Sequence, residues 1–186
     1  MKRFLSLCVV AILGVASLAV AQPAGDVHVK VPIIPAKPED VSSIEAIVKV
    51  SYDAISGGVG VPRQWARERT IYDVHQRFVS ASPDPKTGVP KIDGSNDQEY
   101  ADQSDAFMVK EGFTERELGH EIHRFGNVAT VLSSYETVLA STGKVMDRGV
   151  NIFSLYFDGK RWWILSIIWD TERKDNPIPP ALLPKG

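Results

Sequence analysis

The last third of the chain constrains the fold most, because three segments there are dense in β-branched and aromatic residues. They are VATVLSSYETVL (128–139), GVNIFSLYF (149–157) and RWWILSIIW (161–169). Segments of this composition, separated by turn residues such as Asp158-Gly159, predict consecutive antiparallel strands. One face of such a sheet has to be covered, and the earlier part of the chain has to supply the covering elements.

Helical patterns dominate that earlier part. A stripe of apolar residues predicts a first helix between Asp40, which can cap it, and Gly57, which can end it. A short helix begins near Pro62, with Trp65 and Tyr72 near one face. A strand over 72–81 and a helix over 96–110, capped by Asp97, come next. Helices followed by a run of strands predict an α+β fold with helices packed on one face of a bent sheet.

The N-terminus is typical of a secretory signal. Lys2 and Arg3 precede an apolar run, and Ala19-Val20-Ala21 supplies a small-x-small cleavage site. We expect cleavage between Ala21 and Gln22 and an exported protein, periplasmic or extracellular; an uncleaved membrane anchor is the weaker alternative. The predicted organisation is a signal peptide (1–21), a proline-rich arm (22–38), one domain (39–172) and a proline-rich tail (173–186).

Composition excludes several classes of function for the mature chain. The one cysteine, Cys8, lies in the signal, which leaves no disulfide, thiol nucleophile or thiolate ligand. Cleavage removes two of the 21 basic residues and none of the 23 acidic ones, so the net charge becomes −4. Because no basic run is present, we expect neither a nucleic-acid partner nor, after cleavage, a membrane partner.

The order of elements, together with RFGNVATVLSSYET and RGVNIFSLYFDGKRWWILSIIWDTE, resembles the nuclear transport factor 2-like superfamily, in particular its SnoaL-like bacterial branch. The resemblance covers about residues 40–172. It implies a cone-shaped fold in which a curved antiparallel sheet wraps around the N-terminal helices and leaves a pocket. It does not imply one activity, since the superfamily includes isomerases, dehydratases, cyclases and binding domains.

The segment HEIHRF (120–125) is close to a zinc-protease signature but does not match it. That signature needs histidines at i and i+4, whereas His120 and His123 are three residues apart. A helix beginning at a Thr114–Glu117 capping box is an alternative. Gly126-Asn127 reads as a hairpin turn between alternating segments and favours a strand.

With a two-residue turn, period-two alternation places His120 opposite Ser133 and Leu118 opposite Tyr135, on the more apolar face. A bulge at Gly119 would turn His120 to the other face and change this assignment. His120, Ser133 and Tyr135 form either a hydrogen-bonded core cluster or a polar patch on the pocket wall.

Other polar residues complete the set of candidates. Asp73 and His75 lie on the same side of one strand and form the best acid–base pair, with exposed surface beside Arg77 as the alternative. Asn151 and Ser166 interrupt apolar strands and face each other if the last hairpin has a two-residue turn. The pocket candidates are therefore Tyr72, His120, Ser133, Tyr135, Asn151 and Ser166.

These observations lead to two hypotheses. The first is an exported ligand-binding or accessory domain with an apolar pocket, a small apolar ligand, no cofactor and no metal. The alternative is an isomerase, dehydratase or cyclase that uses Asp73, His75 or His120 for proton transfer and Tyr135 as a donor. Outward-facing aromatic residues also suggest a homodimer through the sheet face.

Overall fold

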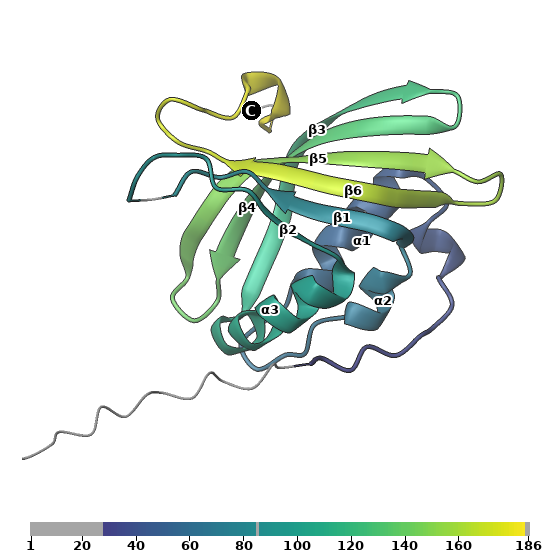
Figure 1. Cartoon of the computed structure of the whole chain (residues 1–186), viewed down its shortest axis with the longest axis horizontal. Coiled ribbons are helices and arrows are strands. Elements are labelled where there is room, and N and C mark those ends of the chain that lie inside the picture. The colour runs from purple at the N-terminus through teal and green to yellow at the C-terminus, as the bar shows by residue number, and fades with distance from the viewer. Residues whose placement is uncertain (1–27, 85, 185–186) are drawn as a thin grey trace, which may run out of the picture.

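The computed structural model describes residues 28–84 and 86–184. The expected cleavage site between Ala21 and Gln22 lies outside the described residues. Six strands form one curved sheet in the order β2-β1-β6-β5-β4-β3, and the helices lie on its concave side (Figure 1). The strands are β1 (Tyr72–Ser80), β2 (Asp93–Ser95), β3 (Phe113–Phe125), β4 (Val128–Leu139), β5 (Lys144–Phe157) and β6 (Trp162–Thr171). The helices are η1 (Pro38–Asp40), α1 (Ile44–Ile55), α2 (Trp65–Arg69), α3 (Asp97–Glu111) and η2 (Pro180–Leu182).

The sheet is antiparallel at every pairing except that of β1 with β6, which is parallel. The helix α1 fills the concave face with an apolar stripe that includes Ile47 and Val48, and it packs among Val131, Phe153 and Ile164 of the sheet. This layer of helix on sheet is the core of the predicted α+β fold.

Both predicted helix caps are wrong by one or a few residues. The hydroxyl of Ser43 accepts the Ala46 N–H at 3.1 Å and caps α1, whereas Asp40 is buried and accepts two 2.7 Å bonds from the Arg67 guanidinium. The cap of α3 is Asn96, which forms a reciprocal capping box with Glu99. Sequence alone does not separate these neighbours, because an aspartate near a helix start is as good a capping acceptor as serine or asparagine.

The β3–β4 hairpin confirms the strand interpretation of HEIHRF. Its register pairs Phe125 with Val128 and His120 with Ser133, as the two-residue turn predicts. Beyond this point a bulge at Leu118 shifts the register, and Glu117 rather than Leu118 lies opposite Tyr135.

The β5–β6 hairpin does not have the two-residue turn that would place Asn151 opposite Ser166. Phe157 pairs with Trp162 across a four-residue loop, in which the Asp158 carboxylate accepts the N–H groups of Lys160 and Arg161. Together with one extra residue in β6, Leu165, this loop places Asn151 opposite Trp169 instead of Ser166.

The C-terminal segment returns across the convex side of the sheet, opposite the helices (Figure 1). Ile178 and Leu182 are buried there, and η2 contacts β3 and β4. The Ser134 hydroxyl donates to the carbonyl oxygen of Leu182, and a Cβ on Gly119 would lie 2.7 Å from the same oxygen. The tail is thus held against the sheet by close packing.

Candidate functional site

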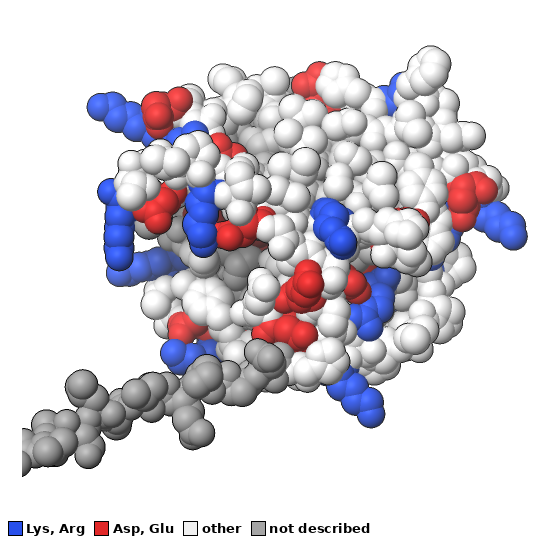
Figure 2. All heavy atoms as spheres, viewed as in Figure 1, with Lys and Arg blue, Asp and Glu red and all other residues white. Residues whose placement is uncertain are grey.

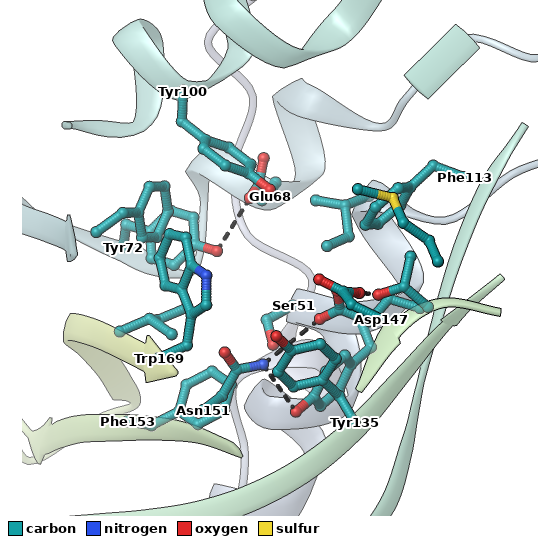
Figure 3. A pocket seen from close by; sticks show the side chains of 17 residues that line it. Ser51, Glu68, Tyr72, Tyr100, Phe113, Tyr135, Asp147, Asn151, Phe153 and Trp169 are labelled. Carbon is teal, nitrogen blue, oxygen red and sulfur yellow. Dashed lines mark hydrogen bonds between the residues drawn. The ribbon is translucent and has the colours of Figure 1, made fainter. Parts of the chain in front are cut away.

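A cavity of about 180 Å³ lies between the helices and the concave face of the sheet (Figure 3). Its lining comes from all three α-helices and from five strands. Eight of the lining side chains are aromatic: Tyr52, Tyr72, Phe78, Tyr100, Phe113, Tyr135, Phe153 and Trp169. Met146 lines the cavity and is half exposed, which places it where the cavity meets solvent.

Two carboxyl groups lie in a row on one wall of the cavity. Glu115 of β3 and Asp147 of β5 both pair with Thr137 of β4 in the sheet register, so the three side chains share the concave face. The Thr137 hydroxyl donates to Glu115 Oε2 at 3.0 Å. Asp147 Oδ1 is buried and has no hydrogen-bond partner among the described residues.

Burial controls the protonation of these acids. Desolvation raises the pKa of Glu115 to about 7, and the neighbouring Asp147 adds to the rise. Desolvation also raises the pKa of Asp147. At pH 7 the Glu115 carboxyl is therefore near the midpoint of its titration, whereas a surface glutamate is ionised.

A chain of hydrogen bonds supports this wall from behind. Asn151 Nδ2 donates to the Tyr52 hydroxyl at 3.1 Å and approaches Glu115 Oε1 at 3.4 Å. The Tyr52 hydroxyl lies 2.7 Å from Ser133 Oγ, which donates to Glu117. These bonds fix the orientation of Glu115 and Asn151 before any ligand arrives.

A third carboxyl group lies on the opposite side of the cavity. Glu68 of α2 is buried and accepts a 3.0 Å hydrogen bond from the Tyr72 hydroxyl (Figure 3). Desolvation raises the pKa of Glu68 to about 8. This acid is therefore largely neutral at pH 7.

Three β-bulges determine which side chains reach the cavity. The extra residues are Leu118 in β3, Met146 in β5 and Leu165 in β6. Each bulge reverses the alternation of the strand beyond it. The Leu118 bulge turns Glu115 inward, and the Leu165 bulge turns Trp169 to the same face as Trp162.

The structure brings only part of the predicted set together. Tyr72, Tyr135 and Asn151 line the cavity. Ser133 is fully buried beside it, and Ser166 pairs with Ser154 away from it. His120 is partly exposed, 3.1 Å from Glu117, and does not line the cavity.

The predicted acid–base residues do not converge. Asp73 accepts a 2.6 Å hydrogen bond from Tyr156, which lowers the pKa of Asp73, and His75 is exposed. Neither lines the cavity that contains Tyr135. The carboxyls that do line it, Glu68, Glu115 and Asp147, were absent from the prediction.

Comparisons with known proteins give the fold. No protein-family model and no curated protein matches the chain. Among solved structures, it is similar to Rv3472(D26N), a function-unknown protein from Mycobacterium tuberculosis, with a TM-score of 0.53 and 17% identity over 72% of this chain and 73% of that one. It is also similar to an NTF2-like protein of unknown function from Shewanella baltica (TM-score 0.44, 16% identity, 70% and 94% of the two chains). A third is the β subunit of the benzoate 1,2-dioxygenase from Burkholderia mallei, with a TM-score of 0.44 and 17% identity over 64% of this chain and 84% of that one. The chain has the nuclear transport factor 2-like fold.

Within this nuclear transport factor 2-like fold, the described residues contain no group of three or more His, Cys, Asp or Glu side chains arranged to hold a metal ion. None of the described helices is long and apolar enough to cross a bilayer. On the face shown in Figure 2, acidic and basic side chains are interspersed. The cavity itself combines aromatic walls with three carboxyl groups.

Proposed function

We propose that this protein binds a small organic molecule in the cavity between its helices and the concave face of the sheet, as an exported binding or accessory domain. The observation that carries the proposal is the Oδ1 of Asp147, which is buried and has no hydrogen-bond partner among the described residues, in a cavity lined by eight aromatic side chains. A buried polar atom without a partner is costly, and a ligand group that bonds to it removes the cost. Aromatic walls with a few fixed polar groups are typical of small-molecule sites.

Native mass spectrometry of the protein purified from its own host tests this proposal. We expect a retained molecule in the wild type and its loss in Met146→Trp, which places a large ring at the opening of the cavity. Val145→Trp is the matched control, since Val145 is equally exposed on the neighbouring position and does not line the cavity. A retained molecule that survives Met146→Trp unchanged, or a wild type that never carries one, contradicts the proposal.

One observation favours a second candidate, an enzyme that transfers protons. The pKa of Glu115, raised to about 7, suits a general base at neutral pH, and Tyr52 and Asn151 are donors fixed beside it. Deuterium incorporation from heavy water into a panel of ketones tests this activity. Exchange that depends on Glu115 and is lost in Glu115→Gln supports an enzyme, and exchange at the rate of buffer alone excludes it for that panel.

The proposed setting is outside the cytoplasm. Lys2, Arg3, the apolar run and Ala19-Val20-Ala21 support it. N-terminal sequencing of the protein from its host should give Gln22 as the first residue. An intact Met1 or a chain retained in the inner membrane would contradict cleavage.

A further inference from the structure

The cavity has a charge composition that selects among small molecules. Three carboxyl groups line it, and none of the described lining residues is a lysine, arginine or histidine. Burial raises the pKa of both acids, the charge of Asp147 raises the pKa of Glu115 further, and hydrogen bonds from Thr137 and Asn151 oppose the rise, so no basic residue is among the causes. The wall formed by these two acids therefore lacks the counter-charge that buried carboxylates in proteins ordinarily have.

The aromatic residues stand across the cavity from this wall. In Figure 3, Tyr72, Tyr100 and Trp169 lie on one side and Asp147 and Tyr135 on the other, with the hollow between them. The electron-rich faces of such rings attract cations, and their area binds an apolar body. Both walls therefore favour the same kind of ligand.

We propose that the ligand is a small organic amine that carries a positive charge, with its ammonium group at Glu115 and Asp147 and its apolar body against Trp169 and Tyr72. This inference rests on the proposed binding function and names the class of ligand. The ammonium group donates to Asp147 Oδ1, the oxygen that has no partner among the described residues. It also supplies the charge that allows both carboxyls to ionise at neutral pH.

Other chemistries fit the cavity less well. An anionic ligand would meet carboxyls on two walls and no basic group. A metal ion would find two carboxyls on one wall, fewer ligands than a hard cation requires. A neutral ligand that accepts a hydrogen bond from a protonated Asp147 is the strongest competitor, and it is separated from the amine by experiment.

Three probes of matched shape test the inference: phenethylamine, 2-phenylethanol and phenylacetate. Binding is measured at pH 8 by titration of the full mature chain, with tryptophan fluorescence and amide NMR shifts around Asp147 as readouts. We expect phenethylamine to bind at least about tenfold more tightly than the alcohol, with no saturable binding of the acid. Asp147→Asn and Glu115→Gln should each remove this preference.

The variants are chosen so that misfolding does not imitate the expected result. Both replace an acid of the cavity wall by its neutral amide, which keeps the shape and removes a charge, so the melting temperature should not fall. Glu121→Gln is the matched control, because Glu121 is exposed on β3 and does not line the cavity. It should retain the wild-type preference for the amine.

The outcomes separate the two levels of the proposal. If the alcohol binds as tightly as the amine and shifts the same signals, the cation inference is wrong and the binding function stands. If phenethylamine does not bind, or binds Asp147→Asn and Glu115→Gln as it binds the wild type, the cation inference is also wrong. The binding function is then decided by the retained molecule in Met146→Trp and Val145→Trp.

Discussion

At the scale of single residues, Arg63 shows how one buried side chain can join several segments. Its guanidinium donates to the carbonyl oxygens of Ile55 at 3.2 Å, Phe113 at 2.9 Å, Gly58 at 3.0 Å and also Val61. These bonds connect the end of α1, the loop after it and the start of β3. Burial lowers the pKa of Arg63. Because its hydrogen-bond partners are neutral carbonyl groups, Arg63 acts by holding these segments in place.

We expect Arg63→Met to lower the free energy of unfolding by about 2–4 kcal/mol, because four carbonyl groups lose a charged donor in a buried place. Urea denaturation measures the change. Arg77→Met is the control, since Arg77 is exposed and donates to the carbonyl of its neighbour Gln76. Its effect should stay within about 0.5 kcal/mol. Equal effects of the two substitutions would contradict the structural role of Arg63.

Glu115 makes stability depend on pH in a predictable direction. Its pKa is raised from 4.5 to about 7 in the folded protein, so the folded state keeps a proton that the unfolded state releases between these values. Stability from this group is present below pH 4.5 and is lost as pH rises through 7. Asp147, whose pKa is also raised, acts in the same direction, and the facing Tyr52 and Asn151 stay neutral.

Glu115→Gln should therefore raise the melting temperature by a few degrees at pH 8 and change it little at pH 4, since only the ionised carboxylate is costly to bury. Scanning calorimetry across this pH range measures the difference. Glu121→Gln should show no such trend. A difference that shrinks towards high pH would mean that Glu115 is stabilised, rather than strained, by its ionisation.

At the scale of elements, sequence patterns predicted most strands and helices but not the faces that reach the cavity. The predicted β4 (128–139) and the register from Phe125 to His120 are confirmed, because Gly126-Asn127 fixes the turn. The three bulges were not predicted in full. An alternating pattern of apolar and polar residues does not reveal where a strand contains an extra residue. Gly119 suggested a bulge beside His120, and the extra residue is its neighbour Leu118.

The missed site follows from those bulges. Without the Leu118 bulge, Glu115 would face away from the core, and without the Leu165 bulge so would Trp169. Asp147 lies next to the bulged Met146, in a segment with no strong strand pattern. The residues that carry the proposed chemistry are therefore those for which local pattern and tertiary register disagree.

The connection from α3 to β3 depends on Gly112. Its φ of 68° ends the helix, and an added Cβ would lie 2.5 Å from Val59 N and 2.8 Å from Ala140 Cβ. Gly112→Ala should lower the free energy of unfolding by about 2–4 kcal/mol, from backbone strain together with the clash. Gly143 has a similar φ of 66°, and an added Cβ would meet nothing within 4 Å. Gly143→Ala should therefore lower the free energy of unfolding by the backbone strain alone, about 1–2 kcal/mol. If denaturation gave the two variants equal stability, the packing around Gly112 would not matter.

At the scale of the whole molecule, the C-terminal tail and the sheet form one packed unit. Gly119 has space for no side chain, because Leu182 lies against it. We expect Gly119→Ala to displace the tail, expose Ile178 and Leu182, and make residues 173–184 sensitive to limited proteolysis. Gly94→Ala is the control, since its nearest contact would be an ordinary 3.7 Å. A tail equally protected in both variants would show that the contact at Gly119 adapts easily.

Beside the tail, the convex face keeps an uncovered apolar row. Leu132, Ile152 and Ile168 are paired across β4, β5 and β6, and Ile152 and Ile168 are 40% and 42% exposed. Val128 and Leu165 extend the patch. Apolar surface of this kind on a sheet face favours association, which motivates the expectation of a homodimer through this face.

Ile152→Lys tests that expectation most directly. In a symmetric dimer the substitution introduces two ammonium groups into one interface, and their desolvation and mutual repulsion should shift sedimentation equilibrium towards the monomer by at least about tenfold in dissociation constant. Val145→Lys is the control, because Val145 is 51% exposed on the same strand but lies near its far end, outside the row. The tail limits the geometry, since a partner has to pack beside η2 rather than across the whole sheet. A wild-type mass equal to that of the monomer at high concentration would contradict the dimer, and a dimer that tolerates Ile152→Lys would have to use another surface.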